Sequence, residues 1–232
     1  MTCFDLPMSG TSTAANRHNP VDSAKGCRQR SLSVKIGRLS TLGEKADMRT
    51  LQDHFLIAMP AMGDPNFNGT VTYLCKHSDQ GALGIIINRP LGIQLGEVFR
   101  QLSFDVLDDE QADRPVLGGG PVQPGVGFVL HQSDDDYEST LDGGSAEIKV
   151  TVSKDILNAM AQGQGPQPAL VALGYAGWDA GQLETELAAN AWLSTPADPA
   201  IVFDTPFQNR WAAAAALLGV DISQLSSYSG HA

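Results

Sequence analysis

The sequence is poor in cysteine and in long apolar runs. Its three cysteines, Cys3, Cys27 and Cys75, do not make the disulfide framework of a small secreted protein. No stretch approaches the ~20 consecutive apolar residues that span a membrane, and the N-terminus lacks the apolar core of a secretory signal. These absences predict a cytoplasmic protein in a reducing compartment, without membrane contact.

Basic side chains are also scarce. The chain has 232 residues and a formal net charge of −11. Residues 1–47 hold seven Lys or Arg against four Asp or Glu, a balance of +3, so residues 48–232 carry −14. Because this excess repels a phosphate backbone, the composition disfavours direct nucleic-acid binding. The acidic runs Asp134–Asp136 and Asp108–Glu110 lack the spaced ligands of a calcium loop and are interpreted as solvated loops.

The first 47 residues show no helical or strand periodicity. Such a segment cannot bury enough apolar surface to order itself, so we expect a disordered N-terminal extension at 1–47 and one domain at 48–232. Two other origins of the extension stay open. In the first, the start codon is assigned too far upstream and Met48 is the true first residue. In the second, the segment is a targeting peptide, although its acidic residues are atypical of one.

The rest of the chain mixes short apolar strands with short helices. Strands are expected at residues 54–59, 69–77, 81–88, 116–117, 126–131, 146–152 and 170–175. Helices are expected at 95–102, from Asp179 with Gln182 as its capping-box partner, and from an N-cap at Thr205 to a left-handed cap at Gly219. Because strands and helices do not alternate strictly, the pattern favours an α+β fold with mainly antiparallel strands.

Cys75 and His77 are the candidate catalytic residues. Being two positions apart on a strand, they are expected on the same face as Val71 and Tyr73, roughly 7 Å apart at the backbone. An imidazole beside a thiol lowers the thiol pKa and supplies a base for nucleophilic chemistry. The alternative is a buried structural cysteine, since free cysteine is among the most buried residue types and no third residue is marked to orient His77.

The run Gly118, Gly119 and Gly120 is the first candidate for ligand binding. Consecutive glycines let backbone amides approach an anion closely. A phosphate loop would continue with Lys and then Ser or Thr, whereas Pro121 and Val122 follow here. A tight turn between strands is therefore the competing interpretation.

Residues 174–181 are the second candidate for ligand binding, with Tyr175, Gly177 and Trp178 as its named residues. We expect this stretch between a strand and a helix N-terminus, where backbone amides point outward. In the alternative, the glycines allow a sharp turn and Trp178 packs on the core. The histidines lack the paired spacing of a zinc site, so neither a metal nor a cofactor is predicted.

Several motifs follow one another along the chain. They are His54-Phe-Leu-Ile-Ala-Met-Pro60, Gly69 to His77, Gly84-Ile-Ile-Ile-Asn-Arg-Pro90, Gly119-Gly-Pro121 leading to Gly127-Phe-Val-Leu-His131, Ala172-Leu-Gly-Tyr-Ala-Gly-Trp178, Gly181-Gln-Leu-Glu184 and Asn190-Ala-Trp192. As a set they resemble the YqgE/AlgH family of small bacterial proteins over residues 50–232. The resemblance implies an α+β fold whose bifurcated β-sheet curls into a pseudo-barrel with flanking helices. The N-terminal extension departs from the family, whose members usually begin near Met48.

For function, the resemblance brings no particular reaction with it. The AlgH name implies a role in transcriptional regulation of alginate production. Given the acidic charge, that role points to an unknown protein partner or small ligand rather than to DNA contact. The resemblance also draws attention to Asn88, with Cys75 and the two glycine-rich stretches, as positions that would line a shared cleft.

Two functions follow from these observations. The favoured one is a non-enzymatic ligand- or partner-binding module in which the two glycine-rich stretches form a groove. The alternative is a thiol-dependent enzyme or redox sensor that uses Cys75 with His77 as its base, which requires an accessible thiol with a depressed pKa.

Overall fold

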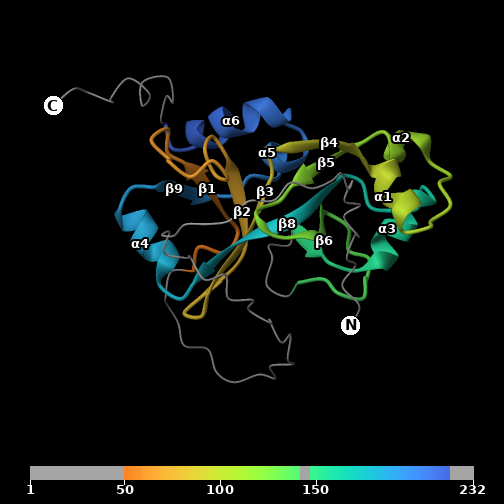
Figure 1. Ribbon diagram of the computed structural model, residues 1–232, viewed down its shortest axis with the longest axis horizontal. Helices are drawn as coiled ribbons and strands as arrows, with labels where there is room; N and C mark the ends of the chain where they lie inside the picture. Colours follow the sequence, from red (N-terminus) through yellow and green to blue (C-terminus); the bar gives the residue numbers. More distant parts are fainter. Residues whose placement is uncertain (1–49, 142–146, 220–232) are drawn as a thin grey trace, which may run out of the picture. The chain divides into compact units, whose positions relative to one another are not determined.

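The computed structural model describes residues 50–141 and 147–219 (Figure 1). The extension expected at 1–47 and residue 146, the expected start of one strand, lie outside these residues. The described strands are β1 (His54–Ala58), β2 (Val71–Ser78), β3 (Gly81–Ile86), β4 (Pro90–Gln94), β5 (Pro115–Gly118), β6 (Val122–His131), β7 (Lys149–Thr151), β8 (Ala169–Asp179) and β9 (Trp192–Pro196). The described helices are α1 (Leu95–Gln101), α2 (Asp109–Ala112), α3 (Lys154–Ala161), α4 (Gln182–Ala188), α5 (Pro199–Phe203), the 3₁₀ turn η1 (Phe207–Asn209) and α6 (Arg210–Ala216).

The sheet branches at β8. The C-terminal part of β8 pairs with β3, which continues through β2 and β1 to β9. Its N-terminal part pairs with β6 on one side and with β5 on the other. Among the described strands β5 and β8 run parallel, and the other pairings are antiparallel. The expected α+β class and the bifurcated, mainly antiparallel sheet are therefore confirmed, and the described sheet is not closed into a barrel.

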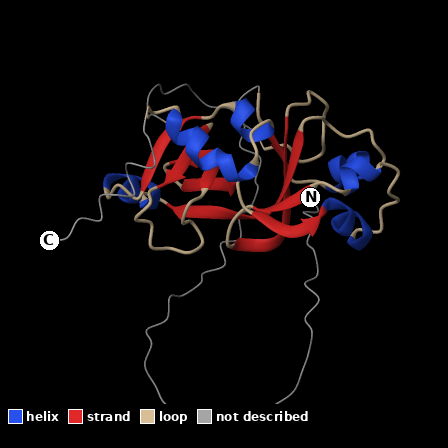
Figure 2. Ribbon diagram, turned by 90° about the horizontal axis from the view of Figure 1, so that it is seen from above, coloured by secondary structure: helices blue, strands red, loops and turns tan. Residues whose placement is uncertain are grey.

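The two branches enclose the largest apolar core. This core joins Phe55 and Tyr73 of one branch to Phe128 and Leu130 of the other, and α5 and α6 pack against it. Helices α1 and α3 cover the opposite face of the β6–β8 branch, whereas α4 and the loop after β1 cover the opposite face of the β1–β3 branch. Figure 2 shows the helices lying outside the strands. β3 is central, as its apolar pattern predicts, because it lies between β2 and β8.

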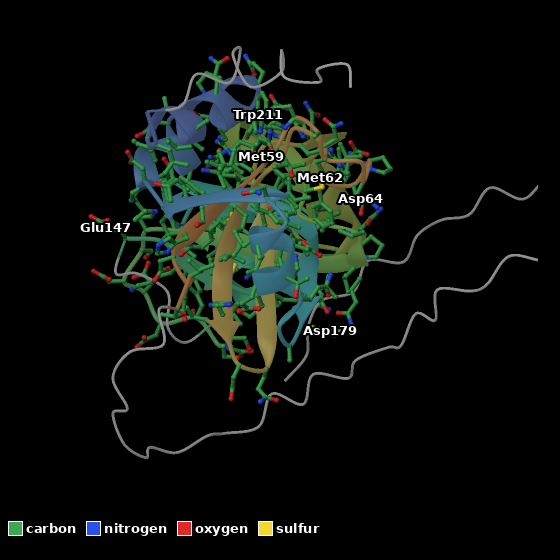
Figure 3. The ribbon with its side chains drawn as sticks, turned by 90° about the vertical axis from the view of Figure 1, so that its left-hand side faces the viewer. Met59, Met62, Asp64, Glu147, Asp179 and Trp211 are labelled. Carbon is green, nitrogen blue, oxygen red and sulfur yellow. The ribbon has the colours of Figure 1, made fainter. Side chains whose placement is uncertain are left out.

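Two side chains fasten α6 to the sheet. The buried Arg210 donates from Nε to the Thr205 carbonyl at 2.9 Å and from Nη1 to the Ile87 carbonyl, and burial lowers the pKa of its guanidinium to about 10. The indole of Trp211 donates to the Ala58 carbonyl at 3.0 Å, and Figure 3 shows Trp211 close to Met59, which follows β1. These bonds cap carbonyls at the ends of β1 and β3.

The expected N-cap of the last helix at Thr205 is wrong. The Thr205 hydroxyl donates back to the Ala200 carbonyl and so closes α5, and α6 begins only at Arg210, after η1. The left-handed residue expected after this helix is confirmed, because Gly219 has a φ of 69°. Sequence patterns also missed α3, α5, β4 and β9. The acidic run Asp108–Glu110, expected as a solvated loop, instead begins α2, with Asp108 as its N-cap.

Candidate functional site

The predicted catalytic pair is separated by a β-bulge. Leu74 pairs with Gly84 and Lys76 with Leu83, so Cys75 is an extra residue in β2. Cys75 lies in the core between the branches. His77 pairs with Ala82, which packs on the opposite face, toward α4. The expectation that Cys75 and His77 share a face is therefore wrong, because the bulge resets the alternation of the strand.

Both ring nitrogens of His77 are already bonded. The Leu51 N–H donates to Nδ1 at 3.0 Å, which leaves Nε2 to carry the proton of the neutral ring. Nε2 then donates to Oε1 of Glu184 on α4 at 2.7 Å. Through these two bonds His77 joins three segments of the chain. Because a backbone amide occupies the lone pair of its ring, His77 is not placed as a general base.

Cys75 is buried, with 2% of its surface exposed. Burial is the main cause that raises the pKa of its thiol above the ordinary value, and nearby Asp53 raises it further. A reactive cysteine needs the opposite shift and contact with solvent. Neither requirement of the thiol hypothesis, a lowered thiol pKa and access to solvent, is met at Cys75. The side chain packs as a small apolar residue.

Asn88 is a structural clamp. Its Oδ1 accepts from the Val71 N–H at 2.9 Å and its Nδ2 donates to the Gly69 carbonyl at 2.9 Å. The neighbouring Arg89 donates to carbonyls of the same loop, those of Pro65, Asn66 and Asn68. The two side chains hold the loop before β2 against the end of β3.

The two glycine-rich stretches meet in the fold. A Cβ at Gly119 would lie 2.3 Å from the Gly174 carbonyl oxygen, and one at Gly120 would lie 2.2 Å from the carbonyl carbon of Tyr175. The Gly119 N–H donates to the Leu173 carbonyl at 2.7 Å. We call Gly118–Gly120 together with Gly174–Gly177 the glycine junction. The glycines thus allow the two backbones to lie close against each other, where a ligand was expected. Gly177, in contrast, is exposed to solvent.

Gly174 lies where β8 leaves one branch for the other. Leu173 packs with α1 and α3, Tyr175 packs in the core between the branches, and Ala176 packs toward α4. Strict alternation would put Leu173 and Tyr175 on one face. The left-handed conformation of Gly174, with φ of 75°, makes the change.

A strand was expected to end at Tyr175, but β8 continues to Asp179, so residues 176–179 lie in the strand rather than between it and the helix. The expected capping box is half present, because Gln182 Oε1 accepts from the Asp179 N–H at 3.0 Å, but the N-cap of α4 is Gly181. Trp178 is 5% exposed, and its indole donates to Oε2 of Glu186 at 2.9 Å. Trp192 donates to the same oxygen at 2.8 Å, so the pair fastens α4 to the sheet.

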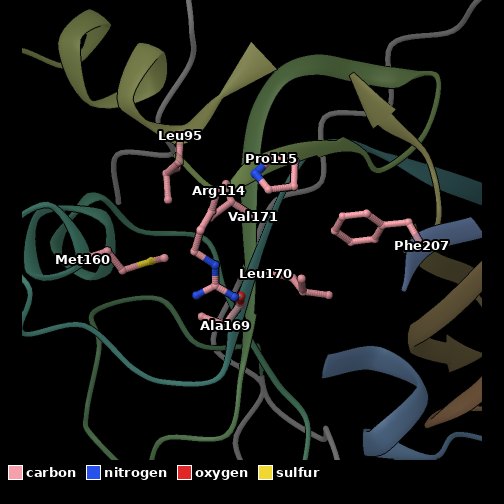
Figure 4. Close-up of a pocket in the computed structure, with 8 residues that line it drawn as sticks. All are labelled: Leu95, Arg114, Pro115, Met160, Ala169, Leu170, Val171 and Phe207. Carbon is pink, nitrogen blue, oxygen red and sulfur yellow. The ribbon is translucent and has the colours of Figure 1, made fainter. Parts of the chain in front are cut away.

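A small cavity lies elsewhere, where the start of β8 meets β5, and has a volume of about 40 Å³. Figure 4 shows Arg114 between the side chains of Met160 and Leu170. Its guanidinium donates to Gln111 Oε1 at 3.1 Å and to the Ala169 carbonyl at 2.6 Å. Burial lowers the pKa of Arg114, and Glu110 opposes this shift. Arg114 was not expected from the sequence, because nothing in the neighbouring residues marks an isolated arginine.

His131 is a further buried polar group, and the sequence did not predict a function for it. It is fully buried, with Nε2 2.8 Å from Thr151 Oγ1, and its Nδ1 accepts from the Ser133 N–H at 3.3 Å. Burial, reinforced by Lys149, lowers its pKa to about 4. Across residues 50–141 and 147–219, no group of three His, Cys, Asp or Glu side chains is arranged to hold a metal ion. No helix in that part of the chain is long and apolar enough to cross a membrane.

Comparison with known proteins gives the family. The model of the AlgH-like family matches residues 55–223. The chain belongs to this family, also called YqgE/AlgH. The UPF0301 protein of Nitrosococcus oceani is 55% identical over 181 residues, which cover 78% of this chain and 96% of that protein. The UPF0301 protein AlgH of Pseudomonas aeruginosa is 55% identical over 183 residues, with the same two shares.

Two solved structures share the fold. The solution structure of AlgH from Pseudomonas aeruginosa has a TM-score of 0.66 at 52% identity and covers 82% of this chain and all of that one. A crystal structure of a protein from Corynebacterium diphtheriae has a TM-score of 0.60 at 16% identity, covering 80% of this chain and 95% of the other. At that identity the second likeness concerns the fold alone.

Proposed function

We propose that this family member is a non-enzymatic cytoplasmic binding module, which acts on transcription indirectly through a protein partner or a small ligand. One observation carries the proposal: both groups suited to chemistry are already engaged. Cys75 is sealed in the core, and the two ring nitrogens of His77 are bonded to Leu51 and Glu184. The engagement of these two candidate groups supports a role in binding over a role in catalysis.

The contact surface that we propose is the outer side of the glycine junction. Gly177 is exposed there, and the half-buried Tyr175 ring lies against it. Leu91 of β4 is 47% exposed and lies over Gly118, since a Cβ at Gly118 would be 3.0 Å from Leu91 Cδ2. An exposed leucine that packs over a glycine presents apolar surface to solvent, which suits a protein partner.

Charge supports action through a partner rather than on DNA. Residues 48–232 carry a net −14, and such a surface repels a phosphate backbone. In a gel-shift assay at physiological salt, the full chain is expected to leave promoter DNA unshifted. A shift that persists at that salt would contradict the indirect route.

The proposed surface is tested with a photo-crosslinking amino acid placed at Leu91 in cells. Leu107 is the matched control, because it is also an exposed leucine, at 76%, but lies in the loop between α1 and α2. A discrete adduct is expected from position 91, weakened by Tyr175→Ala and not seen from position 107. Adducts that are equal at both positions, or none at position 91, would reject this surface.

The alternative function is a thiol-dependent enzyme or redox sensor that uses Cys75 with His77. No specific observation in the described residues favours it, since the burial of Cys75 raises rather than lowers the pKa of the thiol. A ligand that raises the thermal midpoint without measurable turnover supports the binding module. Turnover that disappears in Cys75→Ala would support the alternative.

A further inference from the structure

The cavity beside Arg114 has the features of a small binding site. Its volume is about 40 Å³, whereas one buried water needs about 10–15 Å³, so it has room for about three water molecules or one small organic molecule of similar size. Leu95, Met160, Val171 and Phe207 contribute apolar walls, and Arg114 contributes the charged group (Figure 4).

The guanidinium in this cavity is held in place by neutral acceptors. Its bonds to Gln111 and to the Ala169 carbonyl use two of the five N–H donors of an arginine. Among the described residues, no carboxylate lies within ion-pair distance of Arg114. A partly buried cation without a counter-ion is an unfavourable arrangement that an anion would relieve.

We propose that this cavity binds a short-chain monocarboxylate of the size of acetate or propionate, with the carboxylate on Arg114 and the alkyl stem against the apolar walls. A carboxylate matches the planar donor fork of arginine and gains charge-assisted hydrogen bonds. The space is too small for phosphate esters of sugars or nucleosides. This site consists of other residues than the glycine junction, so either proposal can fail without the other.

Glu110 provides a second test of the proposal, because its charge is expected to oppose the binding that Arg114 favours. It is exposed on α2 and acts electrostatically on Arg114 without forming an ion pair among the described residues. A bound carboxylate would feel the same negative charge as repulsion. Glu110→Gln is therefore expected to tighten binding, whereas loss of the Arg114 charge is expected to abolish it.

The experiment is a titration of the full chain with sodium propionate, matched at every point by sodium chloride at equal ionic strength. The readouts are the thermal midpoint and calorimetric heat. Propionate is expected to raise the midpoint saturably, with a dissociation constant on the order of 1 mM for so small a ligand, while chloride is not. Arg114→Gln is expected to remove the difference, and Glu110→Gln to increase affinity about twofold, as expected for a screened surface charge.

Val171→Ile is the second variant, for the case that Arg114→Gln fails to fold. It adds one methylene to the cavity wall and leaves the charge intact, so weaker propionate binding by a folded protein supports the site. Equal effects of propionate and chloride on the unmodified chain would mean that only water enters the cavity and would overturn the proposal. Propionate binding that survives unchanged in both variants would place the ligand elsewhere and overturn it equally.

Discussion

Cys75 and His77 lie on opposite faces of β2, although they are two positions apart in the strand. Cys75 is the extra residue of a β-bulge and packs between the two branches of the sheet. His77 follows the bulge and reaches Glu184 of α4. The bulge thus divides two residues that sequence spacing pairs, and it places the imidazole in a network that joins β2, α4 and the segment before β1.

The branch point at Gly174 gives the first prediction. A Cβ there would lie 2.5 Å from the Gly120 carbonyl oxygen, and φ is 75°. Gly174→Ala is expected to lower the free energy of unfolding by about 2–4 kcal/mol, because left-handed strain and overpacking add. Urea denaturation measures this loss.

Gly181→Ala separates the two causes. Gly181 has a φ of 74° but nothing within 4 Å of a Cβ, so only the left-handed strain of about 1 kcal/mol is expected. Equal losses for the two variants would show that the close approach of Gly120 and Gly174 does not constrain the fold.

The shared acceptor of the two indoles gives the second prediction. Trp178 and Trp192 both donate to Oε2 of Glu186. Glu186→Ala leaves two mostly buried donors without a partner and is expected to cost about 1–3 kcal/mol, with a change in tryptophan fluorescence of the folded protein. Glu184→Ala on the same helix removes only the exposed bond to His77 and is expected to cost less than 1 kcal/mol. The reverse order of the two losses would contradict the anchoring role of Glu186.

Sequence alone gave most of the sheet, because alternation and apolar runs are local signals. β1 and β3 begin at His54 and Gly81, as their patterns indicate, and β6 ends at His131 as expected but begins at Val122 rather than at Val126. Sequence did not reveal the bulge at Cys75, since each side chain around the extra residue is also compatible with a regular strand. Nor did it show that β8 continues beyond Tyr175 to Asp179, because the pairing of this part with β3 depends on distant parts of the chain. Asn88 was expected to line a ligand cleft, whereas the bonds of its amide go to the protein's own backbone.

The buried His131 gives the third prediction. Its folded-state pKa of about 4 lies below the ~6.5 of an unfolded histidine, so the unfolded chain binds more protons between these values. The contribution of neutral His131 to stability is therefore complete above pH ~6.5 and lost as pH falls toward 4, by up to about 3 kcal/mol. Urea denaturation from pH 7 to 4 is expected to show a shallower decline for His131→Gln than for the unmodified chain. Parallel declines would mean that His131 is protonated in the folded state.

The alkylation rate of Cys75 as a function of pH tests the central claim most directly. In the full chain with Cys3→Ser and Cys27→Ser, Cys75 is the one remaining thiol. The burial of Cys75 predicts slow labelling of the folded protein at every pH, with no apparent pKa below the ~8.5 of free cysteine. His77→Ala is expected to leave the labelling rate of the folded protein unchanged. Labelling is expected to become fast once urea unfolds the chain. Rapid labelling of the folded protein with a lower apparent pKa, raised by His77→Ala, would contradict the binding-module account and establish thiol chemistry.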